Sequence, residues 1–274
     1  MKTYTTTILL FLFFSLNAIG QPREYGDAPE NAIAYPSTGI IGIFPTCKTV
    51  GVSYVEHNNF GAVLGPAFDM EMDGNAGLCP GFAPYDNDEC FADGDAGLLM
   101  PETYTIVNNV VVTCPNSVGT PLGAPCTMAN WGANIDITVA NNMPNQTTGY
   151  MNVIIDFDQN GQWGDLVNCP SGQIPEHVLQ NHIVPWGYSG PLSGLAPPGF
   201  MIGPNNGYVW ARFSITEQPV AINWDGHGSF EDGESEDYLI EIQTLNISDF
   251  GDAPEDVLAY PSTGVIGAFP TCIN

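Results

Sequence analysis

The sequence predicts an all-β protein, an antiparallel β-sandwich of the jelly-roll or immunoglobulin-like kind. Three observations support this fold class. Glycine and proline contribute 31 and 23 of the 274 residues, which leaves little room for helices longer than two or three turns. Short runs rich in β-branched residues alternate apolar and polar side chains, as half-buried strands do. Hydrophobic residues make up 44% of the chain, enough for a packed core.

The first twenty residues are predicted to be a signal peptide. Lys2 precedes an apolar run over 8–16 that is too short to span a bilayer, and Ala18-Ile19-Gly20 offers small residues at a cleavage site. The mature chain would begin at Gln21 and be secreted or held at the cell surface, without inserting in a membrane after cleavage. Export to an oxidising environment favours disulfides for its cysteines.

The strands are predicted from patterning in chain order. They lie at 104–113, 134–140, 150–157, 208–216 and 238–242. Residues 176–184 fit either a short helix or a strand, bounded by prolines at 175 and 185. The stretch 42–97 has scattered glycines and acids and is expected to be loop-rich.

An internal repeat organises the chain. Residues 26–47 and 251–272 are identical at 17 of 22 aligned positions. We therefore expect the first unit to end near 248. The predicted division is a signal peptide at 1–20, a loop-rich, disulfide-containing N-terminal part at 21–130, a sandwich at 131–248 and the truncated start of a second unit at 249–274.

Seven cysteines fit this division. Cys272 repeats Cys47, so its partner would lie in the second unit. The first unit holds six cysteines, enough for three disulfides with 15 possible pairings. Among these we predict the local bridges Cys79–Cys90 and Cys114–Cys126, which leaves Cys47–Cys169.

The loop 156–165 has the spacing of a calcium-binding turn. Oxygen-bearing side chains stand at its first, third and fifth positions and glycine at its sixth. Val167 stands at position twelve, where such loops place a carboxylate, so any missing ligand must come from elsewhere in the fold. The candidate ligands are Asp156, Asp158, Asn160, Gln162 and Asp165.

The loop 223–234 has the same outline, with glycine at position six and a carboxylate at position twelve. His227 at position five is a poor ligand for a hard cation and weakens this prediction. Both loops carry an aromatic residue at position eight and aspartate at position ten. The candidate ligands are Asn223, Asp225, Ser229, Asp232 and Glu234.

A third acidic stretch places Asp69, Glu71 and Asp73 alternately with methionines. On a strand these carboxylates would share one face and repel one another unless a cation lay among them. The acids at 86–89 and 93–95 are similar, and there a solvated loop is favoured. For every acidic loop the alternative is an ordinary turn, in which Asp, Asn and Gly are common. Ligands that are all oxygen favour calcium.

The charge pattern excludes some functions. The net charge is −26, and the cations are Lys2, Arg23, Lys48 and Arg212, too few for a surface that binds nucleic acid or anionic lipid. With 30 acids any two carboxylates could be called a catalytic pair, and no nucleophile motif stands out. We expect no enzymatic activity.

Three segments resemble bacterial surface proteins that contain the GEVED domain. They are the GDAPE…YPSTG openings of the repeat, IIDFDQNGQWGD at 154–165, and GESEDY at 233–238, where Ser235 replaces the valine of the family name. The resemblance covers most of 131–245 and the repeat openings, and leaves 48–130 unexplained. It implies an exported, disulfide-containing β-sandwich module of long multidomain chains, adhesive or structural, without an established enzyme activity.

The sequence therefore predicts a secreted, calcium-stabilised and non-catalytic sandwich repeat of a cell-surface or adhesion protein. Its expected partners are neighbouring repeat units and an extracellular protein or glycan. The alternative is a carbohydrate-binding module of a larger secreted enzyme whose catalytic part lies outside this chain.

Overall fold

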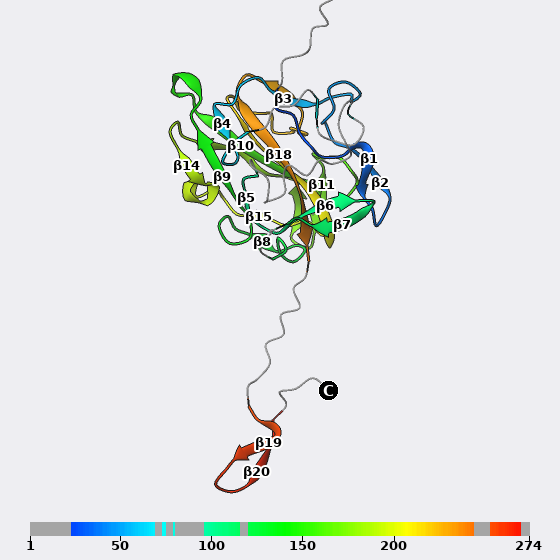
Figure 1. The fold of residues 1–274 in the computed structure, drawn as a ribbon, viewed down its shortest axis with the longest axis vertical. Helices are drawn as coiled ribbons and strands as arrows, with labels where there is room; N and C mark the ends of the chain where they lie inside the picture. The colour runs from blue at the N-terminus through cyan, green and yellow to red at the C-terminus, as the bar shows by residue number, and fades with distance from the viewer. Residues whose placement is uncertain are drawn as a thin grey trace, which may run out of the picture.

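The computed structural model describes residues 23–68, 73–74, 79, 96–115, 120–243 and 253–269. The described residues up to 243 form the predicted all-β antiparallel sandwich, and residues 253–269 form a separate hairpin (Figure 1). The helices in the described residues are two short 3-10 turns, Pro144–Gln146 and Leu192–Leu195. Within this part of the chain, no helix is long and apolar enough to cross a membrane.

The larger sheet has six strands. Its order is β13 (His177–Val184), β10 (Gly149–Ile155), β16 (Gly207–Thr216), β18 (Gly233–Ile242), β6 (Thr103–Val107) and β7 (Val110–Thr113). The smaller sheet contains β14 (Ser189–Pro191), β9 (Asp136–Asn141) and β4 (Ala62–Val63), and β5 (Leu98–Met100) also pairs with β9. Strands before residue 130 thus pair directly with strands after it.

The remaining strands form two-stranded pairs. These are β1 (Glu30–Tyr35) with β2 (Ile40–Ile43), β11 (Leu166–Cys169) with β12 (Gly172–Pro175), β8 (Met128–Ala129) with β15 (Phe200–Met201), β3 (Val55–His57) with β17 (Gly228–Phe230), and β19 (Glu255–Tyr260) with β20 (Val265–Ala268). The β3–β17 pair is parallel.

The predicted strand at 104–113 is two strands. Asn108 and Asn109 both have positive φ, 51° and 61°, and reverse the chain between β6 and β7. Asparagine adopts this left-handed conformation more readily than other non-glycine residues, which suits a tight hairpin turn. The ambiguous stretch 176–184 forms a strand from His177 onward, with register shifts where it pairs with β10.

The larger sheet is buried on both faces at its centre. Along β16, Val209, Ala211, Phe213 and Ile215 pack into the main core against the smaller sheet, as their alternation predicts. On the opposite face, Trp210 packs in a second cluster with residues of β1 and Phe44. The N-terminal hairpin therefore covers the outer face of this sheet.

A buried ion pair holds the N-terminal segment on this outer face. The Arg212 guanidinium lies 2.6 Å from Asp237 and donates to the carbonyls of Pro45 and Gly226, 2.8 and 2.7 Å away. Asp237 also accepts hydrogen bonds from the backbone N–H groups of Asp27 and Ala28, each at 2.8 Å. The GDA and FPT segments of the repeat thus contact the central strands β16 and β18 on the outer face of the larger sheet.

Gly26 is required by this close approach. A Cβ atom at this position would lie 1.9 Å from Nη2 of Arg212. Any side chain would therefore displace the buried guanidinium from Asp237.

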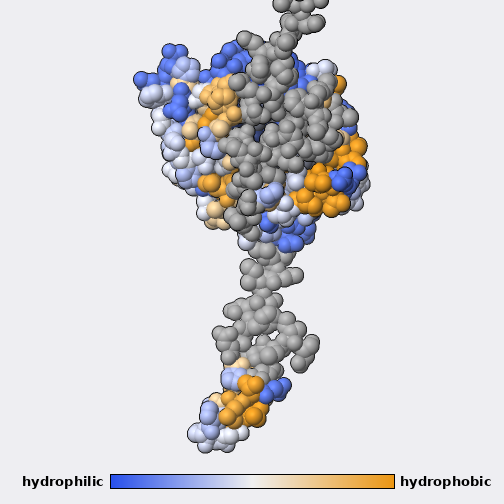
Figure 2. Space-filling model, viewed as in Figure 1, coloured by the Kyte–Doolittle hydropathy of each residue, from blue (hydrophilic) through white to orange (hydrophobic). Residues whose placement is uncertain are grey.

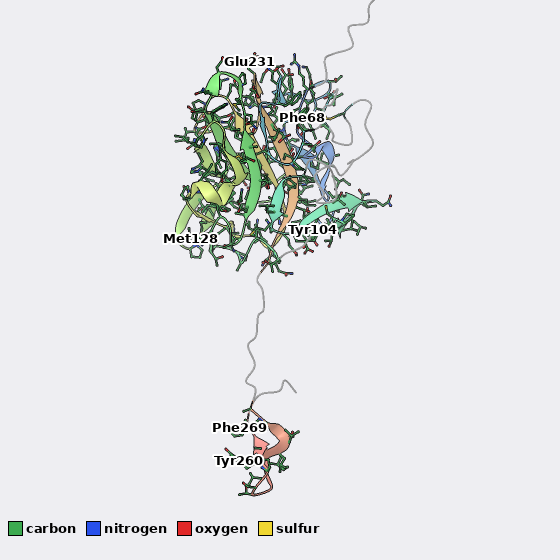
Figure 3. The ribbon with its side chains drawn as sticks, turned by 60° about the vertical axis from the view of Figure 1, so that its left-hand side comes forward. Phe68, Tyr104, Met128, Glu231, Tyr260 and Phe269 are labelled. Carbon is green, nitrogen blue, oxygen red and sulfur yellow. A yellow bond between two sulfur atoms is a disulfide. The ribbon has the colours of Figure 1, made fainter. Side chains whose placement is uncertain are left out.

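The second hairpin, β19–β20, has the same pairing as the first, but its side chains are exposed where those of the first are buried against the larger sheet. Glu30, Ile33 and Tyr35 pair with Ile43, Ile41 and Ile40, and the residues 225 positions later pair in the same register. Tyr35 is 4% exposed, whereas its counterpart Tyr260 is 56% exposed. Figure 2 shows apolar side chains at the surface of the second hairpin, on which Figure 3 labels Tyr260 and Phe269.

The disulfides differ from the predicted pairing. Cys47 bonds to Cys79 and Cys126 to Cys169, across 32 and 43 residues. Cys114 is also disulfide-bonded, and Cys90 and Cys272 lie outside the described residues. All three predicted bridges are therefore wrong. The prediction paired cysteines adjacent in the sequence and left Cys47 for Cys169, whereas the fold brings the end of the N-terminal hairpin to Cys79 and the end of β11 to Cys126.

Candidate metal centre

The loop 156–165 begins where β10 ends and curls around the carboxylate of Asp156. This carboxylate accepts hydrogen bonds from the backbone N–H groups of Asn160 and Gly161 at 3.1 and 2.9 Å. The hydroxyl of Tyr35 donates to it at 2.8 Å. Asp156, at the first position of the predicted motif, is fully buried, and the loop backbone folds around its carboxylate.

Glycine at the sixth position has a steric reason. Gly161 has a φ of 87°, in the left-handed region, and a Cβ there would lie 2.7 Å from the carbonyl oxygen of Ile41. The carbonyl of Gly161 accepts a hydrogen bond from the Ile43 N–H at 2.7 Å. The loop is thereby fixed against the edge of β2.

Glu176 closes the loop from another part of the chain. Its carboxylate accepts hydrogen bonds from the N–H groups of Phe157, Gly164 and Asp165 at 2.8, 3.0 and 3.0 Å, and more weakly from Asp158 at 3.5 Å. The side chain is completely buried. Glu176 is absent from the sequence-based candidates. The signal for it was Val167 at position twelve, which required a ligand from elsewhere in the fold.

Carboxylate oxygens of Asp156, Asp158 and Glu176 lie within 4.8 Å of one another. All three Lys and Arg side chains in the described residues are paired with other acids, Arg23 and Lys48 with Glu56 and Arg212 with Asp237. Burial raises the pKa of Asp156 to about 7. Burial and the repulsion from Asp156 raise the pKa of Glu176 to about 8. Without a cation, the cluster thus favours binding protons near neutral pH.

The other candidates of the first loop surround this cluster. The amide nitrogen of Asn160 lies 3.1 Å from a carboxylate oxygen of Asp158 and 2.8 Å from one of Asp165. Gln162 donates to the same Asp165 oxygen at 3.4 Å. The amide of Asn160 therefore separates two carboxylates by placing a donor between them.

The donor set fits a hard cation. Carboxylate and amide oxygens are the ligands calcium prefers, and a carboxylate has about four lone-pair positions, so those bound to N–H groups retain capacity for an ion. Asp156, Asp158 and Glu176 would hold the ion. Asn160, whose side-chain oxygen accepts a hydrogen bond from the Gln162 N–H at 2.9 Å, would add that oxygen, and Asp165 lies beside it.

The structure does not bring the candidates of the second loop together. Asp225 contacts His227 at the surface, and Ser229 donates to Glu56 at 2.8 Å. Asp232 accepts a hydrogen bond from the N–H of Gly61 and Glu234 from that of Leu64, while Asn223 is exposed. The pairing of β17 with β3 extends residues 228–230 as a strand, so the chain does not curl around a common centre.

The third acidic stretch is described only at Asp73. Its carboxylate accepts hydrogen bonds from the N–H groups of Lys48, Thr49 and Gly74 at 2.5, 3.1 and 3.0 Å. Asp73 thus satisfies the backbone after Cys47. Asp69, Glu71 and the acids of 86–89 and 93–95 lie outside the described residues.

No family model and no curated protein matches this chain. The resemblance to GEVED-containing proteins therefore stays a prediction from the three quoted motifs. The structure gives all three physical roles. Asp237 of the 233–238 motif accepts hydrogen bonds from the repeat opening, and the 154–165 motif supplies two members of the carboxylate cluster.

Proposed function

We propose that this chain is a non-catalytic, calcium-stabilised β-sandwich module of a secreted or cell-surface protein, with an adhesive or structural role. The observation that carries the proposal is the carboxylate cluster of Asp156, Asp158 and Glu176, two of which are fully buried. Burial of ionised carboxylates without a positive partner is costly, and a divalent cation offsets that cost.

Calcium fits the cluster better than magnesium or a transition metal. Its flexible coordination accepts six to eight oxygen ligands, whereas magnesium demands near-ideal octahedral geometry and keeps several waters. Zinc and copper favour nitrogen and sulfur ligands. The loop offers carboxylates and amide groups from residues spread over a wide turn.

An extracellular role is supported by the disulfides. The bridges Cys47–Cys79 and Cys126–Cys169 need an oxidising compartment to persist. The second hairpin also suits a modular protein. Its apolar face is exposed, whereas the same face of the first hairpin contacts a sandwich, so a neighbouring sandwich is the partner that it fits.

The non-catalytic part of the proposal is supported by the position of a serine–histidine contact. His57 lies 2.9 Å from the hydroxyl of Ser235, which lies 2.7 Å from that of Ser214. All three are buried inside the sandwich, and burial lowers the pKa of His57 to about 3. These groups satisfy one another inside the core, where a substrate has no access.

Calorimetric titration of the calcium-free full chain tests this proposal. Extracellular calcium modules bind at about 10⁻⁴–10⁻³ M. With free calcium tenfold above such a constant, one site adds about 1.4 kcal/mol to the free energy of unfolding. We expect the melting temperature to rise in calcium and less in magnesium. Equal melting curves in calcium and chelator, with no heat of binding, would refute it.

A further inference from the structure

A cleft of about 430 Å³ lies beside the loop 156–165, which carries the candidate metal ligands and is called the metal loop below. Its walls are the turn 35–38 of the N-terminal hairpin, residues 109–111 of the β6–β7 hairpin, residues 206–208 at the start of β16, and Gln159 of the metal loop. Figure 1 shows the two hairpins next to each other at one edge of the molecule. The volume is within the range of small-molecule sites.

The lining of this cleft is uncharged, in a chain whose net charge is −26. It combines the ring of Tyr208 with apolar Val110 and with hydroxyl and amide side chains. The side chains of Ser37 and Asn109 have no hydrogen-bond partner within the described residues and can both donate and accept. Figure 2 shows apolar side chains gathered beside this edge.

The ring of Tyr208, which lines the cleft, is held in place by a neighbouring tyrosine. The rings of Tyr208 and Tyr104 meet edge to face with centroids 4.8 Å apart. The hydroxyl of Tyr104 lies 2.9 Å from Glu102 and 3.0 Å from Glu241. Figure 3 labels Tyr104 on β6, at the base of the β6–β7 hairpin. A fixed aromatic surface favours binding because little side-chain entropy is lost.

Two walls of the cleft are bonded to the metal loop. Gln159 donates from its amide to the carbonyls of Asn206 and Tyr208 at 3.1 and 3.0 Å. On the other side, the hydroxyl of Tyr35 donates to Asp156, a member of the carboxylate cluster. The position of both walls therefore depends on the conformation of the loop 156–165.

We infer that this cleft binds a neutral oligosaccharide and that calcium in the loop 156–165 strengthens this binding. A sugar offers an apolar ring face to Tyr208 and hydroxyl groups to Ser37, Asn109 and Gln159. The lining holds no cation for an acidic glycan and no carboxylate for a basic peptide. The site gives the adhesion module a ligand class. Only the calcium dependence rests on the proposed function.

The test is calorimetric titration of the full chain with neutral hexasaccharides of glucose, xylose, mannose and N-acetylglucosamine, with oligogalacturonate as the acidic probe and a proline-rich peptide as a further control. We expect at least one neutral hexasaccharide to bind and the other two probes not to bind. Tyr208→Ala should weaken binding about tenfold, the scale of one aromatic contact. Asn109→Gly removes the amide at an exposed hairpin tip, and glycine tolerates the positive φ of this position, so it should weaken binding severalfold without affecting folding.

Trp186→Ala is the matched control, because Trp186 is 49% exposed and lies outside the cleft lining. Binding that survives Tyr208→Ala and Asn109→Gly but is lost with Trp186→Ala overturns the inference. So does the failure of every neutral hexasaccharide, or exclusive binding of the peptide. Repeating the titration in chelator separates the two proposals. Calcium binding without sugar binding refutes only the cleft, and sugar binding indifferent to chelator refutes the coupling.

Discussion

The loop 156–165 curls around its own carboxylates, whereas the loop 223–234, with the same spacing of oxygen side chains, is drawn out beside a neighbouring strand. In the first loop the backbone N–H groups point to Asp156 and Glu176. In the second, Asp232 and Glu234 bond to the backbone of residues 61 and 64. The two loops are neighbours, since a Cβ on Gly164 would lie 3.5 Å from that of Asp225.

The spacing of oxygen-bearing side chains along the chain is therefore not sufficient to form a metal site. The aromatic residue at position eight is buried in both loops, as Trp163 and Phe230, so both loops anchor in the core similarly. They differ in what meets their N–H groups. The first loop receives a buried carboxylate from Glu176, and the second is paired along β3.

Removing the Glu176 carboxylate is expected to have the largest effect, because only the first loop depends on it. Glu176→Ala removes the acceptor for four backbone N–H groups, of which that of Phe157 is buried and the other three are partly buried. We expect a loss of about 3 kcal/mol in the free energy of unfolding, measured with urea, and no calcium binding by calorimetry. Glu231→Ala, at an exposed position in the second loop, should change the free energy of unfolding by less than about 0.5 kcal/mol. Similar losses in both variants would contradict the role given to Glu176.

The free energy of unfolding should depend on pH through Asp156 and Glu176 of the first loop's carboxylate cluster. In chelator, the folded pKa values of about 7 for Asp156 and about 8 for Glu176 exceed those of the unfolded chain, so the folded state holds more protons between about pH 4 and 8. Stability from this source should therefore be highest below about pH 4, fall as pH rises from there to about 8, and level off above it, with a total loss of several kcal/mol.

Calcium should reverse this loss at neutral pH, because it binds the ionised carboxylates. Urea unfolding at pH 5 and pH 8, with calcium and with chelator, measures both effects. A chelated protein that gains stability between pH 5 and 8 would contradict the assigned pKa shifts.

Removing single carboxylates should separate the two loops. Asp156→Ala and Asp158→Ala should each abolish the calcium-induced increase in stability, about 1.4 kcal/mol at tenfold excess over the dissociation constant. Asp225→Ala in the second loop should leave this increase unchanged, because its carboxylate contacts His227 at the surface. The quantity compared is the difference between melting curves in calcium and chelator. An equal effect of all three variants on this difference would mean that the loops share an ion.

The smallest expected effect concerns Asn160. Its amide places a donor between Asp158 and Asp165 when no ion is bound. Asn160→Asp replaces this donor with a third carboxylate, so stability in chelator should fall by up to about 1 kcal/mol through repulsion. Calcium affinity should rise severalfold, because ligand charge strengthens calcium binding. Lower stability with unchanged affinity would assign Asn160 to the turn alone.

The alternation of apolar and polar residues was sufficient to predict strands and the face that packs into the main core. The alternation of Val209, Ala211, Phe213 and Ile215 predicted which face of β16 meets the main core. It did not reveal that Arg212, on the other face, is also buried, because its cover comes from residues 26–46. The strand predicted at 104–113 was wrong in its middle, where Asn108 and Asn109 were not recognised as a turn.

The fold class, the repeat and the loop whose carboxylates cluster could be predicted from the sequence, because they depend on periodicity, identity and spacing along the chain. The carboxylate that completes the cluster and the pairing of the cysteines depend on contacts between segments that lie far apart in the chain. Glu176 reaches the loop 156–165 through the hairpin β11–β12, and Cys126 reaches Cys169 across 43 residues. Such contacts follow from how strands stack in space, and no short-range pattern encodes them. The same holds for β3, whose pairing with β17 extends the second loop.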